Sequence, residues 1–288
     1  MNESIGTHVP SEPGVFQKVK ARHLIGWLLA TFPALIVYDI YVTGALWQTI
    51  AVYAWVYGVP ILWFFVRARP KGLELGSLRG ALPQSKTWLS YVLLNIPIFM
   101  LSIGSIIVIY SLFARIAPHV VEGLLSKPAS DVQAAASYPL WATLLELFGA
   151  LILAPIVEEF IFRGFLLHRF AEKWGIVKAI VVVSIIFGVL HINFFGAAAF
   201  SVVLCVVYLY TKSIWPSVLL HFVNNVMSSW PTHASSDGAL SAADLQQSYK
   251  VGWAFVIIAL PILIWFIKKH WPKKDAVLPY ALSKKALS

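Results

Sequence analysis

Long apolar runs separated by short polar segments dominate this sequence. A helix needs about 20 predominantly apolar residues to cross a bilayer, and eight stretches approach that length. We therefore predict an all-α fold, a polytopic membrane helix bundle with about eight transmembrane helices. The predicted helices cover residues 24–43, 45–66, 88–113, 139–160, 176–192, 196–211, 214–230 and 251–267. The fifth to seventh are short, so we expect them to be tilted, kinked or packed inside the bundle.

The polar segments divide the chain around these helices. The predicted parts are a polar N-terminal tail (1–23), N-terminal transmembrane helices and loops (24–138), a core (139–230), an external loop (231–250), a last transmembrane helix (251–267) and a basic cytoplasmic tail (268–288). Residues 1–17 show no signal-peptide pattern, and we expect a short disordered tail there. No segment has the composition of a soluble domain.

Composition and charge agree with a membrane protein. Of the 288 residues, 59% are hydrophobic and 12% are charged, against about 25% charged in soluble domains. With eight spans, all but three of the 22 Lys and Arg residues fall on the side of the termini. The exceptions are Arg115, Lys127 and Lys250. Cytoplasmic loops carry the excess of Lys and Arg, so both termini are predicted to be cytoplasmic. The net charge of +9 thus reflects topology rather than a nucleic-acid partner.

Three charges lie close together where the fourth apolar run ends, at Glu158, Glu159 and Arg163. Ionisable residues at membrane depth are costly and mark functional sites by default. Residues four apart share a helix face, so Glu159 faces Arg163, whereas Glu158 points about 100° away and has no local cation. We therefore interpret Glu159 and Arg163 as structural and Glu158 as the chemical group. The alternative is a helix-end anchor at the membrane surface made by all three.

Two of the eight histidines, His191 and His221, lie in apolar runs. His221 and Asn225 are four residues apart and project from one helix face. Phe187 lies four residues before His191 and is expected to place an aromatic ring beside that imidazole. Together with Glu158 these residues suit amide hydrolysis. Glu158 can take a proton from water and return it to the leaving amine, and the other groups can stabilise the oxyanion.

A zinc site is the alternative reading of the same residues. His191 and His221 with one carboxylate could bind zinc and leave a fourth position for water. The helical motif with two histidines four apart around a glutamate is absent. The single cysteine, Cys205, excludes an internal disulfide and a cysteine-based metal site, and we expect it to be a small buried hydrophobe.

Counting along the helices tests whether these groups can meet. At 1.5 Å per residue, Glu158 lies about 18 Å deep from one face, with His191 about 20 Å and His221 about 12 Å from the other. All three fall near the midplane of a hydrocarbon core about 30 Å thick. If the fourth span starts at Leu140 instead, Glu158 moves about 9 Å toward the cytoplasm. A kink at Pro155 could adjust this depth.

At these residues the sequence resembles the CPBP family of intramembrane proteases, which includes the type II CAAX prenyl endopeptidases and bacteriocin-processing and lysostaphin-resistance-like relatives. The Glu-Glu-x-x-x-Arg part of the family pattern is present at residues 158–163, the Phe-x-x-x-His part at 187–191 and the His-x-x-x-Asn part at 221–225. The resemblance covers roughly 139–230. It implies that Glu158 activates water, that Glu159 and Arg163 support it, and that His191, His221 and Asn225 complete the site. The family pattern has been read both as glutamate-dependent and as a metalloprotease; we favour the former, without a cofactor.

The favoured hypothesis is an intramembrane endopeptidase that cuts a membrane-embedded or lipid-modified protein or peptide. Its expected partners are that substrate and the lipid bilayer, and its location is a membrane, the cell membrane if the source is bacterial. The alternative is a non-catalytic immunity or scaffold protein that uses the same fold to bind a partner. A proton-coupled transporter is disfavoured, because no pair of broken helices recurs in two halves of the chain.

Overall fold

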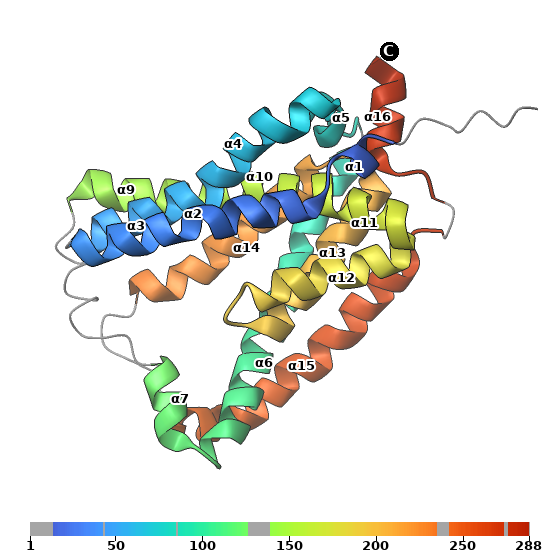
Figure 1. Cartoon of the computed structure of the whole chain (residues 1–288). Coiled ribbons are helices and arrows are strands. Elements are labelled where there is room, and N and C mark those ends of the chain that lie inside the picture. The colour runs from blue at the N-terminus through green and yellow to red at the C-terminus, as the bar shows by residue number, and fades with distance from the viewer. Residues whose placement is uncertain are drawn as a thin grey trace, which may run out of the picture.

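The computed structural model describes residues 14–42, 44–84, 86–125, 139–234, 242–273 and 276–287. In these residues all regular secondary structure is helical, which confirms the predicted all-α class (Figure 1). The α-helices are α1 (Val15–Lys18), α2 (Ala21–Tyr41), α3 (Ala45–Tyr53), α4 (Val59–Trp63), α5 (Leu75–Arg79), α6 (Asn95–Ala114), α7 (Pro118–Leu125), α9 (Leu140–Phe148), α10 (Ala154–Glu159), α11 (Leu167–Trp174), α12 (Ile176–Val189), α13 (Phe194–Thr211), α14 (Trp215–Ala234), α15 (Ala242–His270) and α16 (Pro279–Leu287).

Segments of π and 3₁₀ geometry join several of these helices. The π segments are η1 (Ala54–Gly58), η2 (Phe64–Ala68), η5 (Gly149–Leu153) and η6 (Phe160–Leu166), and the 3₁₀ segments are η3 (Arg69–Lys71) and η4 (Lys86–Leu94). As a result α3 to η3 form one continuous rod, and so do α9 to α11. The second rod, Leu140–Trp174, carries the Glu158 motif and forms the central helix of the bundle.

Six helical segments in the described residues are long and apolar enough to cross a membrane. They are Val15–Tyr41, Leu46–Lys71, Trp88–Ala114, Leu140–Trp174, Phe194–Thr211 and Gln246–His270. The chain is therefore an integral, multi-pass membrane protein. Two of the eight expected spans are helical but lie outside these six. Helix α12 has 14 residues, about 21 Å at 1.5 Å per residue, and α14 contains several polar side chains. The number of crossings and the side of the termini stay predictions.

Helices extend into segments that were expected to be polar tails or loops. Helix α14 continues to Ala234 and α15 begins at Ala242, so only 235–241 of the expected external loop 231–250 lie outside the described residues. An acidic residue, Asp244, lies in the first turn of α15, where a carboxylate favours helix formation. Helix α1 and the start of α2 lie within the expected tail 1–23, of which residues 1–13 are outside the described part. Helix α16 lies within the expected basic tail and begins at a proline, a residue favoured in the first helical turn.

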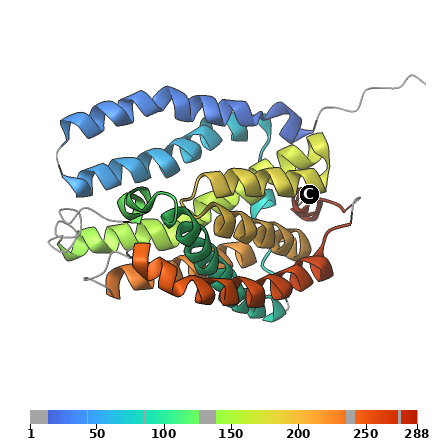
Figure 2. The same ribbon diagram turned by 90° about the horizontal axis from the view of Figure 1, so that it is seen from below.

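The central helix passes between α2 to α4 on one side and α13 and α14 on the other (Figure 2). Helices α2 and α3–α4 run side by side at one edge of the bundle, and α6 and α15 lie at the opposite edge (Figure 2). Gly104 on α6 and Gly252 on α15 allow these two helices to pack closely. A Cβ atom at Gly104 would lie 2.8 Å from the carbonyl oxygen of Gly252. Small residues at such contacts are typical of membrane helix pairs.

The central helix departs from regular α geometry on both sides of α10. Pro155 is in the first turn of α10 and follows the π segment η5, while η6 begins directly after Glu159. Proline removes a backbone donor, and single-turn π segments inside helices occur frequently at functional sites. Glu158 and Glu159 therefore lie between two π segments, and Arg163 lies within the second of them. The depth of Glu158 in the membrane stays a prediction.

Candidate active site

The three sequence motifs lie in three parts of the chain, the central helix, the end of α12 and α14, and converge on one region of the bundle. Glu158 and Glu159 end α10, Arg163 lies in η6, His191 follows the end of α12, and His221 lies on α14. The ring of Phe187 packs against both imidazoles, with centroids 4.3 Å from His191 and 5.9 Å from His221. Phe187 itself is 1% exposed, so it forms a fixed wall between the two histidines.

Glu159 and Arg163 form a fully buried ion pair. The Arg163 Nη1 atom donates to Glu159 Oε1 over 2.7 Å, and both side chains are 0% exposed. The other terminal nitrogen of Arg163 donates to the backbone carbonyl of Ser201 at 3.2 Å and to its hydroxyl at 2.9 Å. The guanidinium also lies 5.0 Å from the centroid of the Phe187 ring. The pairing expected from the four-residue spacing is therefore present, and Ser201 on α13 is a partner that spacing did not indicate.

His221 links the two glutamates. Its Nδ1 lies 2.9 Å from Glu159 Oε1, and its Nε2 lies 3.9 Å from Glu158 Oε2. An ionised carboxylate can only accept hydrogen bonds, so Nδ1 carries the hydrogen and Nε2 faces Glu158. Glu159 therefore binds both Arg163 and His221. This bridge joins residues 62 positions apart, which helix spacing could not reveal.

Glu158 is the less engaged of the two carboxylates. Its side chain is 17% exposed, against 0% for Glu159. The hydroxyl of Tyr57, from η1, donates to Glu158 Oε1 over 3.4 Å. Within the described residues, Oε2 of each glutamate is buried without a hydrogen-bond partner, but Oε1 of Glu159 binds two side chains whereas Oε1 of Glu158 accepts only the long bond. Glu158 thus combines partial exposure with free acceptor capacity, which is what a general base needs.

Tyr57 is the site residue that the sequence analysis missed. It is 8% exposed and lies 101 positions before Glu158, in an apolar run with no motif around it. Its placement depends on close packing one turn earlier. The ring of Tyr53 lies against Gly149 of η5, where an added Cβ would collide with it. The sequence signal for Tyr57 is a tyrosine within a membrane span, and tyrosines of this kind are common.

His191, His221 and Asn225 share a cavity of about 480 Å³. Its wall is completed by Ile98, Ser102, Phe187, Leu190, Ile192, Asn193, Gly196, Ala197, Phe200, Asn224 and Ser228. His191 Nδ1 donates to the carbonyl of Phe187 over 2.7 Å, which leaves its Nε2 available. Asn225 Nδ2 donates to the carbonyl of Ala150 at 2.9 Å and has a second N–H. Glu158 does not line this cavity, but its Oε2 lies 3.9 Å from Nε2 of His221, which does.

The side chains around the two histidines do not make up the ligand set of a zinc site. Both imidazoles donate from Nδ1 to a carboxylate or a carbonyl, which is the usual outer support of a metal-binding histidine. A catalytic zinc site nevertheless needs three protein ligands. In the described part of the chain, no three His, Cys, Asp or Glu side chains are grouped so that they could hold a metal ion. The residues in this arrangement therefore do not fit zinc.

Residues 139–227 match the family model described as type II CAAX prenyl endopeptidase Rce1-like. The matched segment contains Glu158, Glu159, Arg163, His191, His221 and Asn225. It confirms the resemblance to CPBP-family intramembrane proteases and supports a protease at the general level. No curated protein and no solved structure matches the chain significantly.

Proposed function

We propose that this protein is an intramembrane endopeptidase that hydrolyses a peptide bond of a membrane-embedded or lipid-modified protein or peptide. The observation that carries the proposal is the division of labour between adjacent glutamates. Glu159 is fully buried and binds both Arg163 and His221 through Oε1, while Glu158 is 17% exposed and accepts one long hydrogen bond, from Tyr57. The Rce1-like match over the same helices supports the reaction class.

In this proposal Glu158 acts first as a general base. A water molecule held at Glu158 Oε2 loses a proton to the carboxylate and attacks the carbonyl carbon of the scissile bond. The C–O bond forms, and the carbonyl electrons move to oxygen, which gives a tetrahedral oxyanion. Glu158 then transfers its proton to the amide nitrogen and the C–N bond breaks. The products are a carboxylic acid and an amine, and Glu158 returns to its ionised form.

His221, His191 and Asn225 stabilise the oxyanion in this proposal. The two imidazoles already use Nδ1 as a donor, so each can donate from Nε2 only when the ring carries both hydrogens. For His221, the carboxylate of Glu159 at 2.9 Å balances the positive charge of such a ring. The second amide N–H of Asn225 donates without any change in protonation. Preorganised donors of this kind often supply much of the rate enhancement of an enzyme.

The direct test compares protein termini in membranes that hold wild type or Glu158→Gln at matched levels. Glutamine keeps the size of the side chain but cannot take the proton from water. New termini in the wild-type membranes alone are expected, and they would identify the substrate and the bond together. Glu146→Gln removes a carboxylate from the same central helix and is the matched control, expected to cleave like wild type.

If the protein termini are the same in membranes with wild type and with Glu158→Gln, although expected partners are present, the result favours the non-catalytic alternative. An immunity or scaffold protein needs the fold and its binding surface, and would keep its partner in Glu158→Gln. Co-purification of the same membrane protein with both variants, without cleavage by either, would overturn the enzymatic proposal.

A further inference from the structure

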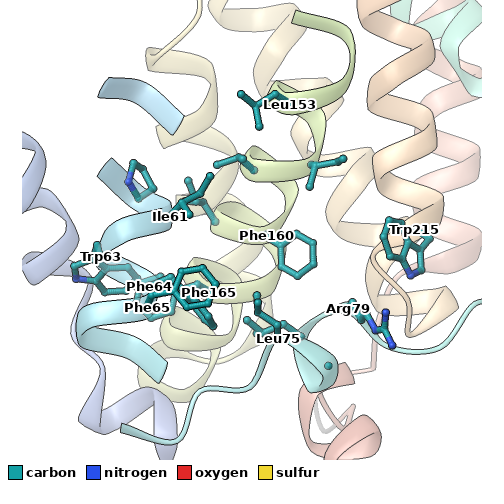
Figure 3. Close-up of a pocket in the computed structure, with 16 residues that line it drawn as sticks. Ile61, Trp63, Phe64, Phe65, Leu75, Arg79, Leu153, Phe160, Phe165 and Trp215 are labelled. Carbon is teal, nitrogen blue, oxygen red and sulfur yellow. The ribbon is translucent and has the colours of Figure 1, made fainter. Parts of the chain in front are cut away.

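A second cavity lies on another face of the central helix (Figure 3). This lateral groove has a volume of about 620 Å³, within the range of small-molecule pockets. One side is formed by Ile61, Phe64 and Phe65 of α4 and η2, and the other by Leu153 and Phe160 of the central helix (Figure 3). None of the residues proposed for catalysis lines it.

The lateral groove is open toward the outside of the bundle. Ile61, Phe65 and Leu75 each line it and are 40%, 45% and 41% exposed. In a membrane protein such exposed apolar side chains face lipid, because hydrocarbon is the solvent at that depth. An apolar chain entering from the bilayer would therefore gain packing contacts with aromatic rings without crossing water.

One end of the groove carries positive charge. Among its lining residues Arg79, at the end of α5, is the one with a charged side chain, and it lies beside Trp215 (Figure 3). A second guanidinium, that of Arg69, lies 5.8 Å from the centroid of the Phe65 ring, which also lines the groove. Within the part of the chain that the structure describes, neither arginine forms an ion pair. Both belong to the loops that the Lys and Arg distribution assigns to the cytoplasm.

We propose that the lateral groove binds an anionic membrane phospholipid, with an acyl chain between α4 and α10 and the phosphate held by Arg79. Guanidinium groups match phosphate geometry, and anionic lipids enrich the cytoplasmic leaflet of many membranes. An apolar slot with an arginine at one end selects a ligand with a long apolar tail and a negative head. The proposal does not depend on the proposed proteolytic activity.

The test measures thermal unfolding of the purified full-length protein in mixed detergent micelles that contain phosphatidylglycerol or phosphatidylcholine. Phosphatidylglycerol is expected to raise the midpoint by several degrees more than phosphatidylcholine, because only a lipid that binds the native state stabilises it. Arg79→Gln is expected to weaken the phosphatidylglycerol effect at least fivefold in apparent affinity. Arg79→Lys keeps the charge and should retain most of it.

A control removes the same charge elsewhere. Lys178→Gln takes an exposed lysine from the same predicted side and should leave the phosphatidylglycerol effect unchanged. An equal effect of both lipids, or an equal loss in this control, would overturn the proposal. Ile61→Trp fills the groove and should also abolish the lipid effect. If it instead abolishes cleavage while the lipid effect persists, the occupant is a substrate segment and the lipid proposal fails.

Discussion

The backbone N–H of Tyr280 donates a hydrogen bond of 3.2 Å to His168 Nε2. His168 is fully buried on the central helix, and its Nδ1 donates to the carbonyl of Arg163 at 3.0 Å, so the tautomer that leaves Nε2 as the acceptor is defined. The C-terminal helix α16 is thereby joined, through one imidazole, to the residue that neutralises Glu159. The sequence indicated only a basic tail at this position.

The hydroxyl of Tyr280 adds a second attachment for α16. It donates to the carbonyl of Gly72 at 3.1 Å and accepts from the N–H of Glu74 at 3.3 Å. Burial raises the pKa of the Tyr280 phenol, so the hydroxyl keeps the proton that it donates. Helix α16 thus ties the segment before α5 to the central helix.

His168→Ala is therefore expected to loosen α16. The variant removes the acceptor of the Tyr280 N–H, at a cost of about 1–3 kcal/mol if that buried group stays unpaired. We expect faster proteolytic removal of residues 276–287 and a lower midpoint of thermal unfolding. His119→Ala, at an exposed position on α7, is the matched control. Unchanged protease resistance of α16 in His168→Ala would contradict the link.

Glu158→Gln is expected to abolish cleavage and leave the fold intact. The substitution removes the proton acceptor but keeps the contact with Tyr57, because a glutamine oxygen can also accept a hydrogen bond. Turnover of the identified substrate should fall below detection, while the thermal midpoint stays within a few degrees of wild type. Retained cleavage by this variant would rule out Glu158 as the general base.

Tyr57→Phe should slow cleavage without stopping it. The hydroxyl makes one long hydrogen bond to Glu158, and a bond of this kind contributes about 0.5–1.5 kcal/mol. That corresponds to a decrease of about 2- to 12-fold in kcat/KM, since each 1.36 kcal/mol is tenfold. Tyr53→Phe, one turn earlier and without a contact to Glu158, is the control that should cleave at the wild-type rate. Equal kcat/KM values for Tyr57→Phe and Tyr53→Phe would show that the Tyr57 hydroxyl has no part in cleavage.

Arg163→Ala is expected to destabilise the protein strongly. Glu159 would remain fully buried without its cation, and breaking such a pair costs about 3–5 kcal/mol. Low expression and a lower midpoint of thermal unfolding are expected. The double variant Glu159→Gln with Arg163→Met should recover part of the loss, because it leaves no buried charge at these two positions. Normal stability of Arg163→Ala would show that the pair is reached by water.

Chelation separates the glutamate mechanism from the zinc alternative. Cleavage by protein treated with 1,10-phenanthroline and then freed of the chelator should match that of untreated protein. Loss of activity that returns with added Zn²⁺, together with loss of zinc binding in His191→Ala, would instead favour a metalloprotease. Zinc content measured by elemental analysis gives a readout that does not depend on activity.

Local patterns predicted much of this structure. In the described residues apolar run length located the long helices, and the four-residue spacing predicted the contact of Glu159 with Arg163 and that of Phe187 with His191. Both contacts join residues four apart in the chain, the first within a helix and the second across the end of α12, so the sequence displays them directly. The roles of Glu158, His221 and Asn225 in catalysis stay predictions.

Contacts between helices could not be predicted in this way. The bridge from His221 to Glu159 and the contact of Tyr57 with Glu158 depend on how separate helices pack. Two helices of known sequence can meet at many rotations and depths, and only the packed bundle selects one. Helices α1 and α16 were not predicted for a related reason. The charged composition of these segments suggested tails, whereas α16 is held by contacts to distant residues, such as the hydrogen bonds of Tyr280.

Two side chains of α14 hold the central helix at separate places. Asn225 binds the carbonyl of Ala150, and His221 binds Glu159, nine residues further along. Sliding or rotating either helix would strain both bonds at once, so residues 150–159 and α14 are expected to move together. The facing segment, α3 to α4, is bound to Glu158 by the long hydrogen bond from Tyr57. In the proposed function, displacing that segment would open the site with the loss of the longest of these three hydrogen bonds.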